Sequence, residues 1–184
     1  YRTWVRWEKA QEHEKGAMQK IYRGSMHTQD PYDSKGLKEV GEIPQASYTY
    51  AYLNTAYPCL NEKQLAIGET TFSGPDTLVN PEGLFMIEEL ERIVLQRCDN
   101  ARDAIKLIDE LTKEYGYGDG GECITIADTK EVWCLEIMGE GKKKKGAIWA
   151  AQRVPDGEVS VSANIPRIKY LNREDPDNFM CSDN

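Results

Sequence analysis

The spacing of apolar residues changes twice along the chain, and this change constrains the fold more than any single motif. Between residues 80 and 116, apolar residues recur every three or four positions, as they do on one face of an α-helix. Before and after this stretch they alternate with polar residues, as they do along β-strands that bury one face. Short turn-forming segments separate the later runs, which favours an antiparallel sheet over repeated βαβ units. The sequence therefore predicts a layered α+β fold in which two helices cover a sheet.

Two helices are predicted within the helical stretch. The first begins with the Asn-Pro-Glu sequence of residues 80–82, which supplies a capping side chain, a proline for the first turn and an acid, and it runs to about residue 98. The second spans residues 101–115, between a capping Asn100 and a terminating Gly116. The periodicity of the first helix predicts water-facing Glu88, Glu89, Glu91 and Arg92, opposite a sheet-facing stripe of Met86, Leu90, Ile93, Val94 and Arg97.

Six alternating runs are predicted to form strands. They are ASYTYAYLN (46–54), QLAIGET (64–70), GECITIAD (121–128), EVWCLEIM (131–138), GAIWAAQRV (146–154) and EVSVSAN (158–164). The first two are expected to pair as neighbours. Residues 1–45 are predicted to be an irregular or partly helical lead-in, in which Trp4, Val5 and Trp7 anchor a short helix. Because the sequence contains no linker and no repeat, residues 1–184 are predicted to belong to a single domain.

Charge and composition argue against several classes of function. The chain of 184 residues has a net charge of −8, and its only dense basic run is Lys142–Lys145, so nucleic acid is not an expected partner. No segment approaches the ~20 apolar residues of a membrane helix and no signal-peptide pattern opens the chain, so a membrane is not expected either. The five cysteines lack Cys-x-x-Cys spacing, and His13 and His27 lie in polar segments. No metal and no other cofactor is therefore expected.

Two motifs have structural interpretations, and a third does not. GYGDGG (116–121) lacks the Lys-Ser/Thr pair of a phosphate loop and follows a helix, so it is predicted to be a helix end and loop. Asp128, in ADTKE, is predicted to accept backbone hydrogen bonds in a turn rather than to catalyse. In contrast, Glu69, Thr70 and Thr71 follow an apolar strand, where an acid and two hydroxyls cost free energy unless something satisfies them. The residues alone thus predict an α+β domain with a polar cluster at a strand end.

Five segments of the chain carry a more specific resemblance. In order, they read NEKQLAIGETTFSG, LERIVLQRCDNARDAIKLIDELTKEYGY, GECITIADTKEVWCLEIMG, AAQRVPDGEVSVSAN and DPDNFMCSDN. Together they cover roughly residues 40–184 and resemble successive motifs of the cysteine dipeptidase family, which includes dipeptidases A and D and is related to the secernins. This family belongs to the N-terminal-nucleophile hydrolases. The resemblance implies an αββα sandwich, in which two antiparallel sheets face each other and helices cover the outside.

The resemblance also implies a nucleophile that these residues do not supply. In the family, the first residue of the mature chain is a cysteine, whose thiol attacks the amide while its own α-amino group handles the proton. Tyr1 is not a cysteine, and the strand pair with an Asp-Gly turn that should follow the nucleophile is absent. The chain is therefore expected to be incomplete at its N-terminus, to have its nucleophilic cysteine upstream, and to be inactive by itself.

Further site residues follow from the more distant resemblance to bile-salt hydrolases and penicillin V acylases. It implies that Thr71 lies on the oxyanion side of the site and that Asn164, at the end of a predicted strand, holds the nucleophile or the oxyanion. Glu69, Thr70 and Arg153 are expected to bind substrate, since a dipeptide presents a free amine and a free carboxylate. The alternatives are a structural ion pair for Glu69 and Arg153, an ordinary strand-end threonine for Thr70, and a turn asparagine for Asn164.

The leading hypothesis is a cysteine-type dipeptidase that acts on small peptides. Two alternatives stay open: a non-catalytic, secernin-like member of the family and an acylase that acts on other amides. The sequence does not decide which side chains a substrate carries or whether identical chains form a homo-oligomer. It also leaves open whether the protein is cytoplasmic, secreted or periplasmic.

Overall fold

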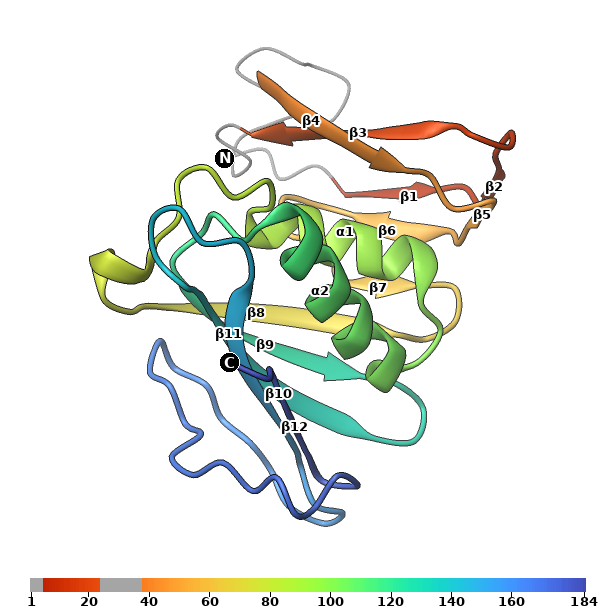
Figure 1. Ribbon diagram of the computed structural model, residues 1–184. Helices are drawn as coiled ribbons and strands as arrows, with labels where there is room; N and C mark the ends of the chain where they lie inside the picture. The colour runs from red at the N-terminus through yellow and green to blue at the C-terminus, as the bar shows by residue number, and fades with distance from the viewer. Residues whose placement is uncertain (1–4, 24–37) are drawn as a thin grey trace.

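One long antiparallel sheet forms the centre of the molecule (Figure 1). The computed structural model describes residues 5–23 and 38–184, and within them this sheet has eight strands. In spatial order they are β1 (Arg6–Glu8), β6 (Tyr52–Asn54), β7 (Leu60–Asn61), β8 (Ala66–Ser73), β9 (Gly121–Ala127), β10 (Val132–Gly139), β11 (Ala147–Arg153) and β12 (Phe179–Cys181). Two smaller sheets pair β2 (Gln11–Glu12) with β5 (Tyr48–Thr49) and β3 (Met18–Arg23) with β4 (Lys38–Pro44).

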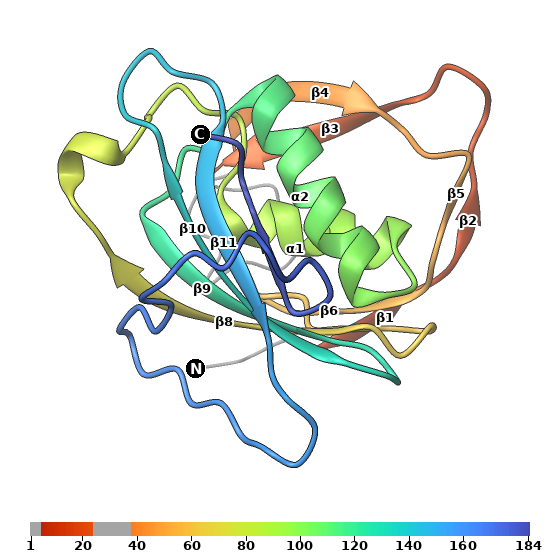
Figure 2. The same ribbon diagram turned by 60° about the horizontal axis from the view of Figure 1, so that its bottom comes forward.

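Both α-helices lie on the same face of the long sheet, which we call the helix face (Figures 1 and 2). They are α1 (Ile87–Arg97) and α2 (Ala101–Tyr115). Their apolar side chains share one buried core with the sheet, including Leu90, Ile93, Ile105, Ile108, Ile67, Ile124, Ile126, Trp133 and Leu135. The α+β class is therefore confirmed. Neither helix of the described residues is long and apolar enough to cross a membrane.

The prediction for α2 is confirmed at both ends. The Asn100 side chain accepts a hydrogen bond from the backbone N–H of Asp103 at 2.9 Å, which satisfies one of the free N–H groups at the helix start. The helix ends at Gly116, whose φ of 87° is accessible to glycine at little cost. The following GYGDGG residues form a loop that leads into β9, as predicted.

The predicted start of α1 is wrong. Asn80 forms a turn instead, with its side chain accepting from the N–H of Glu82 at 3.1 Å, and the helix begins seven residues later at Ile87. Gly83 packs directly on the loop after α2, where an added Cβ would lie 2.4 Å from the carbonyl carbon of Tyr117. Asp119 from that loop accepts the N–H of Ile87 at 3.1 Å. A tertiary contact, rather than the local Asn-Pro-Glu signal, thus sets the helix start.

The prediction that the acids of α1 face water is also wrong. Glu88, Glu89 and Glu91 are 7%, 1% and 2% exposed. The apolar period correctly identifies one buried stripe, but α1 contacts α2 as well as β5, β6 and β7. These elements bury more of the helix surface than a single apolar stripe predicts, and the three acids lie in the buried part.

Several strand predictions need correction. The segment 46–54 is interrupted because the Tyr50 N–H bonds the carbonyl of Gln96 in α1 at 2.8 Å, so it yields the separate strands β5 and β6. The short β7 lies between β6 and β8, which are therefore not neighbours. At the N-terminus, Arg6–Glu8 is a strand paired with Tyr52–Asn54 rather than a helix, because this pairing satisfies its backbone groups. Trp4 lies outside the described residues.

The predicted strand at 158–164 does not form, although β8, β9, β10 and β11 match their predictions. Residues 154–178 are irregular instead, and β12 supplies the strand that pairs with β11. Residues 160–168 of this segment contact the sheet on the side opposite the helices; we call them the strap and this side the strap face. The alternating pattern arises because Ser160 and Ser162 contact the sheet while Val159 and Val161 are exposed.

Candidate active site

The two residues assigned to catalysis by resemblance lie in contact, although they are 93 positions apart. The Nδ2 group of Asn164 donates a hydrogen bond to the backbone oxygen of Thr71 at 2.6 Å, and both residues are exposed. Asn164 does not end a strand; it lies in the strap with a φ of 57°, a left-handed conformation that asparagine tolerates better than most residues. The strap therefore presents one carboxamide to the end of β8.

Glu69 and Thr71 point to the helix face, while Thr70 points to the strap face. Thr71 pairs across the ladder with Glu122, and its hydroxyl donates to the Oε1 atom of Glu69 at 3.0 Å. Since side chains alternate along a strand, Thr70 faces the other way, where its hydroxyl lies 2.6 Å from that of Ser162. The structure thus separates Thr70 from Glu69 and Thr71, but connects it to the strap two residues before Asn164.

Arg153 lies elsewhere on the sheet. Across the paired strands, Thr71 lies level with Trp149 of β11. Arg153 lies level with Ile67, which is four residues from Thr71 along β8. At the rise of a strand this is ~13 Å along the sheet, with two further strands between β8 and β11. The structure therefore does not bring Arg153 to the contact between Thr71 and Asn164.

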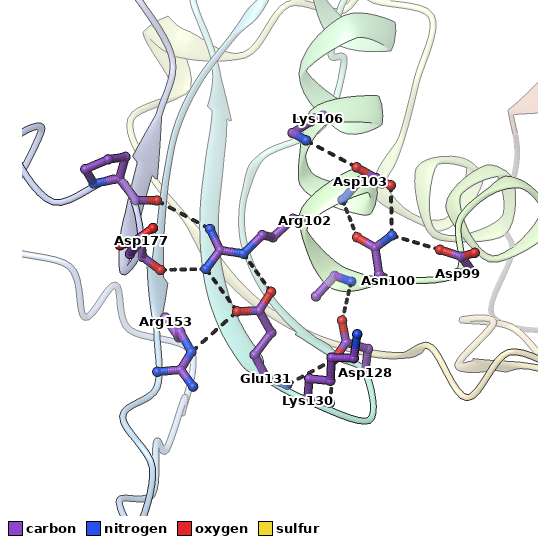
Figure 3. Close-up of polar contacts among 12 residues, drawn as sticks. Asp99, Asn100, Arg102, Asp103, Lys106, Asp128, Lys130, Glu131, Arg153 and Asp177 are labelled. Atoms are coloured by element: carbon purple, nitrogen blue, oxygen red, sulfur yellow. Dashed lines mark hydrogen bonds and ion pairs between the residues drawn. The ribbon is translucent and has the colours of Figure 1, made fainter.

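Arg153 belongs to a compensated ionic group that we call the hairpin network: Arg102, Asp128, Glu131 and Arg153 (Figure 3). Arg102 donates to both oxygens of Glu131 at 2.8 and 3.0 Å, and the Nε atom of Arg153 lies 3.4 Å from Glu131. Asp128 accepts the N–H groups of Lys130 and Glu131 at 2.7 and 3.0 Å, which confirms its predicted role in a turn. It also accepts the N–H of Ala101 at 2.8 Å, so the network holds the start of α2 on the β9–β10 hairpin.

A second group of acids lies beside Thr71 without such compensation. We call Glu69, Glu88, Glu91 and Glu122 the acidic cluster. No ion pair joins any of these four carboxyls to a basic side chain of the described residues. Burial raises the pKa of Glu88 to about 7, and burial together with a hydrogen bond between Glu122 and Glu69 raises the pKa of Glu122 to about 9. Burial also raises the pKa of Glu91 well above its usual range.

Sequence reasoning identified only Glu69 in this cluster. Glu88 and Glu91 were assigned to the water-facing side of a helix, and Glu122 opens a strand without any distinguishing motif. The signal that would have found Glu122 is the register of β8 against β9, which pairs it with Thr71. Residues 66–73 and 121–127 do not specify that register by themselves, since a shift by two residues preserves the same buried face.

Burial makes the thiols of three of the five cysteines less reactive. Cys98, Cys123 and Cys134 are buried, and Cys59 and Cys181 are half-buried. Burial raises the pKa of Cys59 and Cys123, and it raises the pKa of Cys98 to about 12. Because the thiolate is the reactive form, these shifts suppress nucleophilic attack. Among the described residues, no group of three or more His, Cys, Asp or Glu side chains is placed to hold a metal ion.

A hollow on the strap face lies next to the contact between Asn164 and Thr71. It has a volume of about 250 Å³ and is lined largely by apolar side chains, including Phe72, Met138, Ile148, Pro166 and Ile168. Phe72 follows Thr71 directly, and Pro166 lies two residues after Asn164. The site therefore combines exposed donors on one side with an apolar hollow of side-chain size on the other.

Comparison with known proteins identifies the family. The model of peptidase family C69 matches residues 21–184. A probable dipeptidase of Salmonella dublin is 32% identical over 180 residues, which cover 88% of this chain and 39% of that protein. A probable dipeptidase B of Lactococcus lactis subsp. lactis (strain IL1403) is 38% identical over 96 residues, or 52% of this chain and 18% of that protein. A probable dipeptidase of Latilactobacillus sakei is 34% identical over 91 residues, or 50% and 18%.

The chain thus spans between 18% and 39% of the length of these three relatives. The family match nevertheless covers most of the chain, from β3 to its last residue. The chain therefore belongs to peptidase family C69.

Proposed function

We propose that the polypeptide containing these residues is a cysteine-type dipeptidase. The observation that carries the proposal is the hydrogen bond between Asn164 and Thr71, which joins distant parts of the chain at the two positions where the resemblance expects catalytic groups. Membership in peptidase family C69 and the similarity to probable dipeptidases support it. The nucleophile is the thiol of an N-terminal cysteine that these 184 residues do not supply, so this chain alone is expected to hydrolyse no dipeptide.

In the proposed reaction, the cysteine sulfur attacks the scissile carbonyl carbon and its proton passes to the α-amino group of the same residue. The tetrahedral intermediate collapses, the peptide C–N bond breaks, and the leaving amine takes that proton. Water then hydrolyses the thioester and regenerates the thiol. Asn164 bonds Thr71 through one N–H of its carboxamide, so the second N–H remains to stabilise the oxyanion. Such a donor contributes ~3 kcal/mol to the transition state.

Substrate recognition is assigned to Glu69 and the hollow on the strap face. Glu69 lies one hydrogen bond from Thr71 and supplies the negative charge that a free amine requires. The apolar hollow accommodates a substrate side chain. We leave Thr70 and Arg153 out of the proposed site, because the Thr70 hydroxyl is bonded to that of Ser162 and Arg153 pairs with Glu131 and Asp156.

We propose the fold of the complete domain from the same resemblance. Helices cover one face of the long sheet, and the irregular strap lies on the other (Figure 2). A second antiparallel sheet on the strap face would complete an αββα sandwich and cover the exposed Val159, Val161 and Ile165. Residues 1–184 would then be part of a single domain.

The test is Asn164→Ala in the full-length protein, with Asn172→Ala as a matched control in the same irregular segment. We expect kcat for dipeptides to fall ~10²- to 10³-fold in Asn164→Ala, with KM and the melting temperature little changed, because the lost donor acts mainly in the transition state. Thr71→Val should act in the same direction, but less if its backbone N–H is the donor. Asn172→Ala should leave kcat unchanged.

Three outcomes would contradict the proposal. Near-normal kcat with a lowered melting temperature in Asn164→Ala would make Asn164 a structural residue. Hydrolysis of N-acyl amides but not of dipeptides by the wild-type protein would indicate an acylase. No hydrolysis of either substrate by a protein with a verified N-terminal cysteine would indicate a non-catalytic member of the family.

A further inference from the structure

Glu122 is the most unusual side chain next to the proposed site. It is only 3% exposed, and its Oε2 atom has no hydrogen-bond partner. Its carboxyl shares a hydrogen bond with the carboxyl of Glu69 and lies across the ladder from Thr71, on the same face of the sheet. The Glu122 carboxyl is therefore neither paired with a basic side chain nor exposed to solvent.

We propose that Glu122 is a neutral carboxylic acid that donates its proton to Glu69, and that this hydrogen bond positions Glu69 and the Thr71 hydroxyl for the reaction. Glu122 is thus a positioning residue, which acts through two groups of the proposed site without touching the substrate. The role in the reaction rests on the proposed function, whereas the protonation of Glu122 does not.

The hydrogen bond between the carboxyls of Glu69 and Glu122 requires that one of them carries a proton. An ionised carboxylate only accepts hydrogen bonds, so two ionised groups cannot bond each other. The single proton of the Thr71 hydroxyl is directed to Glu69 at 3.0 Å and cannot also join the two acids. The proton belongs on Glu122, because this residue is 3% exposed and burial disfavours an ionised carboxyl, whereas Glu69 is only half-buried.

The surroundings of Glu122 favour the same assignment. Glu88 and Glu91 approach from α1, and Asp119 and Tyr117 approach from the loop after α2. Tyr57 faces the same group of acids from the loop between β6 and β7. None of these groups carries a positive charge, so an ionised Glu122 would meet no opposite charge. The pKa of Glu122 near 9 agrees with this geometry, with burial as its largest cause.

With Glu122 neutral, Glu69 supplies the single negative charge of the pair. The α-ammonium of a dipeptide is separated from the scissile carbonyl carbon only by the Cα atom. When Thr71 lies beside the carbonyl oxygen, the ammonium is within reach of Glu69. Glu69 then supplies one negative charge for one positive charge, while Glu122 holds its carboxyl in place. Ionisation of Glu122 would remove the donated proton and repel Glu69, which would displace Thr71.

Infrared spectroscopy of the full-length protein tests the proton directly. The carbonyl stretch of protonated carboxylic acids should lose one component at pH 7 in Glu122→Gln, and in the wild type this component should disappear with a midpoint near pH 9. A difference spectrum without that component would overturn the inference. This measurement is independent of activity, so it decides the protonation of Glu122 even if no dipeptide is hydrolysed.

Kinetics of three variants test the positioning role. Glu122→Leu removes the hydrogen bond and should lower kcat ~10²-fold, the size expected for a small misplacement of reacting groups. Glu122→Gln keeps a neutral donor and should restore most of that loss, while removing the fall in kcat that we expect near pH 9. Glu91→Gln replaces an equally buried acid with no hydrogen-bond partner and should keep the wild-type pH profile.

Two kinetic results would overturn the positioning role. One is an equal loss of kcat in Glu122→Gln and Glu122→Leu, which would show that the proton is not what matters. The other is an unchanged alkaline fall of kcat in Glu122→Gln. An inactive wild type would instead contradict the proposed function, which is a separate outcome.

Discussion

The acidic cluster and the hairpin network contain the same kind of side chain but neutralise it in opposite ways. In the hairpin network, Glu131 is bonded by Arg102 through both oxygens and Asp128 accepts three backbone N–H groups (Figure 3). In the acidic cluster, both oxygens of Glu91 lack a partner. The first group is held by opposite charge and donors, whereas the buried members of the second group, Glu88, Glu91 and Glu122, have no cationic partner among the described residues and are favoured in their protonated form.

The pKa of Asp128 in the hairpin network shifts in the opposite direction from those of the buried acids in the acidic cluster. Burial alone would raise the pKa of Asp128, but the N–H groups of Ala101, Lys130 and Glu131 together lower it. In the acidic cluster, burial raises the pKa of Glu88 and Glu122 and no basic group offsets it. Strongly shifted acids without a cation are more typical of functional sites than of structural ion pairs. The comparison therefore separates acids that are held by donors and cations from acids that are buried without a cation.

The largest effect on stability is expected when the hairpin network loses the Arg102 side chain. Arg102→Ala leaves Glu131 with one distant partner, removes hydrogen bonds to the carbonyls of Pro176 and Asp177, and exposes the Trp133 ring, which lies 4.8 Å from the guanidinium. We expect the free energy of unfolding to fall by ~2 kcal/mol, a value reduced for partial solvent exposure of Arg102. Urea unfolding at pH 7 measures it.

The matched control for this change is Lys106→Ala, one turn further along α2. Lys106 forms an ion pair with Asp103 at 3.2 Å, but the side chains of both are more than half exposed. Its loss should cost less than ~0.5 kcal/mol. Similar losses in the two variants would mean that the hairpin network does not stabilise the start of α2. The claim that its paired acids stabilise the fold would then be wrong.

The sequence predicted the elements whose signals are local and missed those set by distant contacts. Asn100 and Gly116 lie at the ends of α2 and are sufficient to define it, and Asp128 satisfies its own turn. The start of α1 depends on Asp119, more than thirty residues later in the chain, so no local pattern could locate it. Glu122 was missed for the same reason, since strand register brings it to Thr71.

The strap illustrates a different limit of prediction. The alternation in EVSVSAN is real, but it places serines against the sheet and valines outside, the reverse of a strand that packs on a core. A periodicity of two shows that successive side chains point to opposite sides. It does not show which of the two sets packs against the sheet. The resemblance placed Thr71 and Asn164 in one site, whereas composition and periodicity alone could not connect residues 93 positions apart.

In the acidic cluster, removing a charge should raise stability instead of lowering it. The pKa of Glu91 is higher in the folded than in the unfolded chain, so its contribution to stability is fully present below about 4.5 and is lost as the pH rises toward the folded value. Glu91→Gln removes this loss. We expect the variant to be more stable than the wild type by ~1 to 2 kcal/mol at pH 8, which is ~2 to 8 °C in melting temperature, with little difference at pH 5.

Glu110→Gln is the control, because Glu110 is an exposed acid on α2. It should change stability by less than ~0.5 kcal/mol at either pH. A Glu91→Gln variant that is less stable than the wild type at pH 8 would show that the Glu91 carboxylate has a partner, and the distinction between the two groups of acids would not hold.

The smallest effect, with the opposite dependence on pH, is expected at Asp128. Asp128→Ala removes the acceptor for the N–H groups of Ala101, Lys130 and Glu131, but the Asn100 cap of α2 remains, so the loss at pH 7 should be ~1 kcal/mol. Because the folded pKa of Asp128 is lowered below its usual value of 3.8, its contribution is present above that pH and is lost as the pH falls through the folded value. The melting temperatures of the wild type and Asp128→Ala should therefore approach each other below pH 3, whereas those of the wild type and Glu91→Gln should separate only as the pH rises. A difference for Asp128→Ala that is equally large at pH 7 and at pH 2 would mean that its carboxyl acts through packing rather than through its charge.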